Sequence, residues 1–151
     1  MYSQISKTWQ SILHERTGEI RARAIQLRKE PAMLRVDRPW RLDRARALGY
    51  KAKEGVVVIR MRVSRGGMRR QRPTSGRRPK HMGVLKIKSA MSSQSVAEKR
   101  VLQRHPNMKL LGSYFVWQDG IHAWYEVIMV DPMHPAIKKD YNFRRTLGLV
   151  A

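Results

Sequence analysis

The chain has 151 residues, enough for one domain with a modest core, and it carries a formal net charge of +21. No stretch approaches 18 consecutive apolar residues and the N-terminus lacks an apolar segment, so we expect neither a membrane span nor a secretory signal. The lack of cysteine excludes disulfides and thiolate metal sites. Arg outnumbers Lys, 21 to 11. Because guanidinium groups pair with phosphate and stack on bases, this excess favours a nucleic-acid partner.

A helical segment is predicted over residues 3–30. Its apolar residues recur at helical spacing, first in Ile5, Trp9, Ile12 and Leu13 and then in Ile20, Ala24 and Leu27. A break is expected at Thr17-Gly18, and Pro31 ends the second helix. The arginines of this segment have two readings: they are solvated on the exposed faces, or they also touch phosphate.

The next twenty residues are expected to form an extended stretch followed by a short helix. A proline directly before Trp40 disfavours helix in the residue that precedes it. Trp40 lies beside Arg41, where its ring either stacks on a base or packs within its own protein. Asp43 is expected to cap a helix over 44–48 that stops at Gly49.

From residue 55 to residue 97 the sequence has eleven Arg or Lys and no Asp or Glu. This region begins as a strand with a period of two, which predicts that Val57, Ile59, Met61 and Val63 face the core and that Val58, Arg60, Arg62 and Ser64 face outward. The pattern stops at Gly66-Gly67, which either allows a sharp turn or lets the backbone approach a phosphate. A basic loop is predicted over 65–83, and a short strand over 84–88. Because so many like charges repel one another unless a polyanion lies among them, the loop predicts an arm that binds nucleic acid.

Another helix is predicted after this acid-free region. Ser95 and Glu98 have the spacing of a capping box, in which a hydroxyl and a carboxylate each accept a hydrogen bond from a free amide at the start of a helix. This helix is expected to run to about Arg104, ahead of a proline. A single helical turn is expected at 135–139.

The clearest strand pair follows that helix. Residues 110–117 and 121–130 are rich in β-forming side chains, and Asp119-Gly120 between them has the composition of a type I′ hairpin turn. Together these patterns predict a single domain over residues 1–151, in which helices accompany about four short strands and a basic loop.

Residues that could support catalysis are scattered. The five histidines, none spaced as an acid–base pair, are His14, His81, His105, His122 and His134. The eleven acidic residues are spread along the chain rather than clustered as metal-dependent phosphodiester cleavage requires. We therefore expect no catalytic residues, no metal, no cofactor and no small-molecule substrate. A free RNA- or DNA-coating protein and, less well supported, a small nuclease remain as alternatives to a structural RNA binder.

Three stretches of the sequence are distinctive: RARALGYKAKEGVVVIRMRVSRGGMRRQRP, SAMSSQSVAEKRVLQRHPNMKLLGSYFVWQD and YEVIMVDPMHPAIKKD. They resemble the eukaryotic-type family of large-subunit ribosomal protein fifteen, which archaea and eukaryotes share. The last stretch is more similar to the archaeal version. The resemblance implies an α+β fold, with a small antiparallel sheet of about four strands, packed helices and long basic extensions. It also implies a protein of the ribosome in the cytoplasm, without enzymatic activity, whose partners are large-subunit rRNA and neighbouring large-subunit proteins.

The resemblance and the basic run together nominate the residues that contact RNA. They are Arg41, Arg44, Arg46, Lys51, Lys53, Arg60, Arg62, Arg65, Arg69, Arg70, Arg72, Arg77, Arg78, Lys80, His81, Lys86 and Lys88. The sequence departs from the family pattern after Asp140. There the family has some tens of residues rich in Arg, Gly and Lys, and this sequence has YNFRRTLGLVA.

Overall fold

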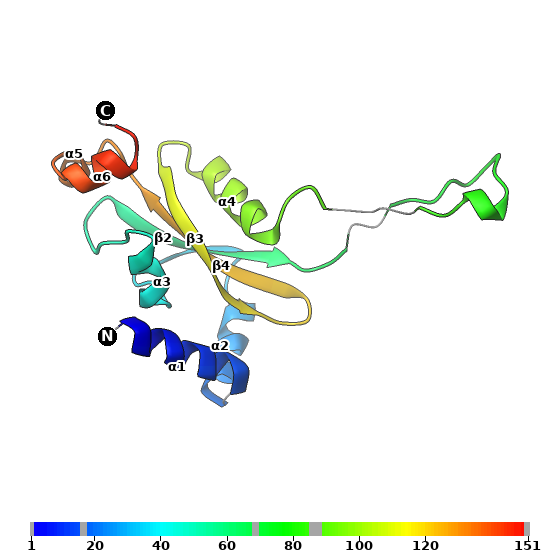
Figure 1. Cartoon of the computed structure of the whole chain (residues 1–151), viewed down its shortest axis with the longest axis horizontal. Helices are drawn as coiled ribbons and strands as arrows, with labels where there is room; N and C mark the ends of the chain where they lie inside the picture. Colours follow the sequence, from blue (N-terminus) through cyan, green and yellow to red (C-terminus); the bar gives the residue numbers. More distant parts are fainter. Residues whose placement is uncertain (1, 16–17, 68–69, 85–88, 150–151) are drawn as a thin grey trace.

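The computed structural model of the chain describes residues 2–15, 18–67, 70–84 and 89–149. Its framework is a four-stranded sheet in the order β1-β2-β4-β3, in which every neighbouring pair is antiparallel (Figure 1). The strands are β1 (Met33–Val36), β2 (Val56–Ser64), β3 (Lys109–Gln118) and β4 (His122–Val130). Six helices accompany this sheet among the described residues, so the predicted α+β class is confirmed.

The predicted hairpin is present as β3 and β4, but its turn is not of type I′. A type I′ turn needs positive φ at both central residues, and Gly120 does not have a positive φ. Instead, Oδ1 of Asp119 accepts hydrogen bonds from the backbone amides of Ile121, at 2.8 Å, and His122, at 2.6 Å. The Asp119 carboxylate therefore stabilises this turn, whereas the sequence analysis attributed the turn to the conformational freedom of Gly120.

Helices cover both faces of the sheet. On one face α4 (Ser93–Arg104) packs Ala97 and Val101 against the strands. On the other face α2 (Gly18–Lys29) contributes Leu27 and α3 (Leu42–Ala47) contributes Ala45. Figure 1 shows α4 on the side of the sheet away from α1 (Tyr2–Glu15) and α2.

This two-sided packing overturns the prediction that one face of β2 points outward. Ile59, Met61 and Val63 do belong to the core beneath α4, as predicted. Val58, predicted to face outward, is also buried, in the second core under α2 and α3. Arg60 shares that covered face and is only partly exposed. Strict alternation identified the two faces, but it did not show that helices would cover both.

The helix starts differ from their predicted caps. The predicted capping box would start α4 at Ser95, but the N-cap is Ser92, whose Oγ accepts a hydrogen bond from the backbone amide of Ser95 at 3.1 Å. Glu98 is engaged elsewhere, because its carboxylate accepts a hydrogen bond from the hydroxyl of Ser113. The N-cap of α3 is Arg41 and no side chain caps it. The predicted cap, Asp43, lies buried in the first turn.

The two N-terminal helices and the C-terminal turn agree with their sequence patterns. α2 ends before Pro31, and its predicted stripe of Ile20, Ala24 and Leu27 is buried. The turn expected at 135–139 is α5 (Pro135–Lys138), and α6 (Tyr141–Thr146) follows it. Their residues Ile137 and Phe143 bury the end of β4 at Val130.

The fourth strand of the described sheet comes from a segment for which no strand was expected. The strand predicted over 84–88 is not tested, because residues 85–88 lie outside the described residues. The edge position beside β2 is taken by β1, in the stretch for which only extended backbone was expected. Residues 65–67 leave the end of β2, and residues 70–84 extend away from the sheet with one short 3₁₀ turn, η1 (Pro79–His81) (Figure 1). Within the described residues no helix is long and apolar enough to cross a membrane.

Truncation of the β2 side chains beneath α4 tests the packing of this core. We expect Ile59→Ala and Met61→Ala each to lower the free energy of unfolding by about 2–5 kcal/mol, because both side chains are buried and truncation leaves a cavity. Urea denaturation followed by circular dichroism measures the effect. Ser64→Ala, at the exposed end of the same strand, serves as the control and should change stability little. Losses below about 1 kcal/mol for both core variants would contradict the assigned packing.

Candidate nucleic-acid interface

The extension formed by residues 65–67 and 70–84, called the arm below, carries cations that the fold leaves free. Six nominated side chains on it are exposed and form no ion pair or hydrogen bond among the described residues: Arg70, Arg72, Arg77, Arg78, Lys80 and His81. Pro73, Met82 and Val84 are half-buried, and every other described arm residue is exposed. The arm therefore presents its charge along an extended segment that its own domain hardly covers.

Three nominated residues of the basic region lie outside the described residues: Arg69, Lys86 and Lys88. Arg44 and Arg46, by contrast, are exposed on α3 and have no ion-pair partner among the described residues. They extend the set of available cations from the arm to the body of the domain.

Arg60 is held inside the protein by two carboxylates. Its Nη2 lies 3.0 Å from Oε1 of Glu126, and its Nη1 lies 3.0 Å from Oε2 of Glu30. The side chain of Arg60 is 13% exposed and that of Glu126 is 0% exposed. The expectation that Arg60 displays its guanidinium to solvent is therefore wrong, because Glu126 of β4 and Glu30, directly after α2, are its partners.

Glu126 also accepts hydrogen bonds from the other side of its carboxylate. Its Oε2 accepts one from the backbone amide of Trp40 at 2.9 Å and one from the hydroxyl of Tyr114. Burial, together with the negative charge of Glu126, raises the pKa of Tyr114 well above its ordinary value of 10.0. The phenol thus remains a donor at any pH the protein meets, and Glu126 joins β2, β3, β4 and the segment before α3.

Trp40 packs within the protein, which favours the second of its two sequence readings. Its ring meets that of Trp9 edge to face with centroids 5.6 Å apart. The guanidinium groups of Arg23 and Arg60 each lie 5.5 Å from the Trp40 ring centroid, a cation–π distance. This cluster fastens α1 to the rest of the fold.

Arg41 is likewise engaged by its own chain. It is buried, its Nη2 lies 3.3 Å from Oδ2 of Asp43, and its guanidinium lies 5.9 Å from the Trp9 ring centroid. Among the described residues its Nε has no hydrogen-bond partner, and neither has Oδ1 of Asp43. The nomination of Arg41 as an RNA contact therefore falls on a side chain that the fold already uses.

Lys51 and Lys53 share one carboxylate at the end of the sheet near α6. Their Nζ atoms lie 3.6 Å and 2.5 Å from Oδ2 of Asp140, and Nζ of Lys51 also lies 5.5 Å from the Phe143 ring centroid. The hydrogen bond from Lys53 lowers the pKa of Asp140 to about 2, helped by the amide of Asn142 and the charges of both lysines and opposed by desolvation. Both lysines remain about two-fifths exposed, at 40% and 43%, so each can also reach an external anion.

The lowered pKa of Asp140 predicts how the stability of the protein depends on pH. Because the folded-state pKa lies below the ordinary value of 3.8, the stabilisation from this carboxylate is complete above about pH 4 and is lost as the pH falls towards 2. At pH 5 we expect the wild-type protein to have a higher Tm than Asp140→Asn. This difference in Tm should shrink as the pH falls to about 2. Lys53→Gln should narrow the difference at pH 5, because it removes the largest cause of the shift. A difference in Tm that stays constant down to pH 2 would contradict this assignment.

Two further nominated arginines, near the start of the arm, each donate a hydrogen bond to a backbone carbonyl. Nη1 of Arg62 donates a hydrogen bond to the carbonyl of Arg28 at 3.0 Å, and Nη1 of Arg65 donates one to the carbonyl of Asp119. Each bond uses one of the five guanidinium donors, so most remain available to a ligand.

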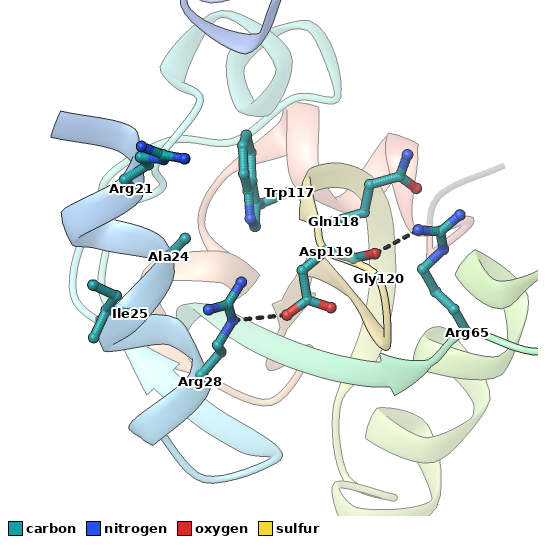
Figure 2. A pocket seen from close by; sticks show the side chains of 9 residues that line it. All are labelled: Arg21, Ala24, Ile25, Arg28, Arg65, Trp117, Gln118, Asp119 and Gly120. Atoms are coloured by element: carbon teal, nitrogen blue, oxygen red, sulfur yellow. Dashed lines mark hydrogen bonds and ion pairs between the residues drawn. The ribbon is translucent and has the colours of Figure 1, made fainter. Parts of the chain in front are cut away.

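A groove between α2 and the β3–β4 turn brings further cations together. It has a volume of about 830 Å³. The side chains around it are Arg21, Ala24, Ile25, Arg28, Arg65, Trp117, Gln118, Asp119 and Gly120 (Figure 2). The sequence pattern left open whether the helix arginines meet phosphate, and it did not associate them with Trp117. A separation of nearly a hundred residues along the chain leaves no local signal of this contact.

At the centre of this groove Arg28 pairs with Asp119. Nε of Arg28 lies 2.9 Å from Oδ2 of Asp119. Burial disfavours the ionised form of Asp119, but hydrogen bonds from the amides of His122 and Ile121 and from Arg28 outweigh it and lower its pKa. The carboxylate thus stays charged at neutral pH and holds Arg28 in place.

Two of the described histidines, His122 and His134, take structural positions. Nδ1 of His134 accepts a hydrogen bond from the amide of Ala136 at the start of α5, and the ring of His122 lies 5.8 Å from that of Trp124. No group of three or more His, Asp or Glu residues in the described ranges could hold a metal ion.

Comparison with known families identifies the fold that carries this cationic surface. The profile of the family described as Ribosomal L15, in its L15e form, matches residues 1–146, which is almost the whole chain. Members of this family are structural proteins of the large ribosomal subunit and not enzymes, and they associate with rRNA and other ribosomal proteins. The chain therefore belongs to the L15e family of ribosomal proteins and is a structural constituent of the large ribosomal subunit.

Proposed function

We propose that the protein binds and stabilises folded rRNA through contacts between its exposed Arg and Lys side chains and RNA phosphates. The observation that carries the proposal is the arm, whose exposed cations have no partner among the described residues (Figure 1). Such a charged segment is stabilised when phosphates lie among its side chains and accept their hydrogen bonds.

The contacts divide the described nominated residues into three groups. The arm cations, together with Arg44, Arg46, Arg62 and Arg65, have donors free for phosphate. Lys51 and Lys53 can serve both Asp140 and RNA. Arg41 and Arg60 are engaged by carboxylates of the fold, so they support RNA binding by keeping the domain in shape rather than by touching RNA.

Contacts of this kind position a protein without reading sequence. Phosphate contacts fix register and orientation, and double-stranded RNA is recognised mostly by shape and by backbone contacts. We therefore expect specificity to come from the fold of the rRNA around the arm, rather than from a base sequence.

The salt dependence of binding tests the proposal. For the full chain and large-subunit rRNA in a filter-binding titration, engagement of roughly eight phosphates gives a slope of log K against log salt of about −6 to −7. A slope shallower than about −2 would show that phosphates are not the main contacts. Duplex DNA of matched length is the control. A free coating protein would bind this DNA as tightly as it binds rRNA, whereas a ribosomal protein should prefer folded rRNA.

A further inference from the structure

We infer that the groove between α2 and the β3–β4 turn is a binding site for a single unstacked RNA nucleotide. In this site the base lies against Trp117, and the phosphate is held by Arg21, Arg28 and Arg65. The inference rests on the proposed rRNA binding and adds to it a second kind of contact. The arm holds RNA by its backbone, whereas the groove holds one base that is out of its helix.

The size and the walls of the groove fit one nucleotide. Its volume of about 830 Å³ lies within the range of small-molecule sites. One side is formed by Ala24 and Ile25 of α2, and Ile25 is 52% exposed although it is large and apolar. The indole of Trp117 lies across from Ala24 at the end of β3, seen edge-on in Figure 2. Flat apolar surfaces of this kind are where proteins stack unpaired bases.

The charge of the groove is complementary to a phosphate. Three guanidinium groups line it, against one carboxylate, that of Asp119. That carboxylate is already engaged by Nε of Arg28, and Arg28 remains 56% exposed, with its other nitrogens available. Arg65 is braced on the carbonyl of Asp119 in the same way. Because two of the three cations are held in place before a ligand arrives, less side-chain entropy is lost when one binds.

The edge of the indole supplies a further donor. Nε1 of Trp117 is buried and has no hydrogen-bond partner among the described residues. In Figure 2 the ring nitrogen lies on the side of Arg28 and Asp119. A carbonyl of a base, or a phosphate oxygen, that reaches this nitrogen can accept the hydrogen bond. A buried donor without an acceptor is costly, so a ligand that supplies one gains affinity.

An acidic peptide is the other polyanion to consider, but it fits the groove less well. Its carboxylates could pair with the arginines, yet it has no planar ring to cover Trp117 and Ile25. The combination of guanidinium forks with a flat apolar wall favours a nucleotide.

The test compares single-stranded RNA with duplex RNA. The full chain is titrated with a fluorescein-labelled single-stranded RNA oligonucleotide of mixed sequence, and with a blunt RNA duplex that has the same number of phosphates. Ile25→Glu places a carboxylate on the groove wall at an exposed helical position. Met133→Glu makes the same charge change at a side chain that is 69% exposed beside α5, at the other end of the sheet.

We expect Ile25→Glu to weaken single-strand binding about tenfold more than Met133→Glu does, which corresponds to the loss of one stacked base. On the duplex the two variants should differ little, because a blunt duplex offers no unstacked base within its length. Equal weakening of single-strand binding by both variants would overturn the inference. So would competition by poly-glutamate at a lower concentration than unlabelled single-stranded RNA, which would assign the groove to acidic peptides.

Trp117→Leu gives a second readout, because it removes the flat ring and keeps an apolar side chain. Binding of single-stranded RNA should quench part of the wild-type tryptophan fluorescence, and this part should be absent in Trp117→Leu. Quenching in Trp117→Leu equal to that in wild type would also overturn the inference. If Trp117→Leu fails to fold, the binding comparison between Ile25→Glu and Met133→Glu decides. Binding to both RNAs with no effect specific to Ile25→Glu refutes the groove site alone. Absence of salt-dependent binding to either RNA refutes the proposed function as well.

Discussion

Arg60→Ala is expected to lower the free energy of unfolding by about 3–5 kcal/mol. The substitution leaves the fully buried carboxylate of Glu126 without its cation, and it removes the ion pair that joins β2 to Glu30 after α2. An uncompensated buried charge costs far more than the net value of the ion pair itself. The guanidinium also contacts the face of Trp40, so the contact between α1 and the sheet should loosen together with the ion pair.

Arg62→Ala is the matched control for this prediction, because Arg62 lies two residues along the same strand and has one hydrogen bond, to a backbone carbonyl. Its substitution should cost about 1 kcal/mol or less. Adding Glu126→Gln to Arg60→Ala should recover part of the loss, since the uncompensated charge is then gone. Urea denaturation of the three variants measures these differences. Equal, small effects for Arg60→Ala and Arg62→Ala would show that the buried network contributes little.

Neutralising the arm should have the largest effect on RNA binding. In the variant with Arg70, Arg72, Arg77 and Arg78 all replaced by Gln, we expect the slope of log K against log salt to become shallower by about 3. Four phosphate contacts then release no counterions. At moderate salt this should weaken binding to large-subunit rRNA by about a hundredfold or more. The melting temperature should remain that of wild type, since none of the four side chains has a partner in the described part of the fold.

The same four positions replaced by Lys provide the control. The charge is kept, so the salt slope should stay close to that of wild type, while affinity falls to the extent that paired guanidinium hydrogen bonds are used. If the Gln variant kept the full wild-type slope, the phosphate contacts would have to lie on the domain body, at residues such as Arg44 and Arg46. The arm would then not be the principal RNA contact.

Local sequence patterns were sufficient for several elements of this protein. The β3–β4 hairpin, the stripe of Ile20, Ala24 and Leu27 on α2, and the end of α4 at Arg104 all follow from periodicity, turn residues and helix breakers within a few positions. The exposed arm also follows from local composition, because a segment with many cations and few apolar side chains cannot bury itself. The family could be recognised from ordered motifs along most of the chain.

Only the tertiary structure decided which cations are available to a ligand. In the sequence, Arg60 and Arg62 are equivalent members of one alternating strand, but Arg60 lies opposite Glu126 across the β2–β4 pairing and is neutralised by it. Lys51 and Lys53 meet Asp140 across nearly ninety residues, and Arg28 meets Asp119 across ninety-one. The groove beside Trp117 has the same origin. These pairings depend on strand order and on helix docking, which place distant residues within a few ångströms and leave no periodic signal along the chain.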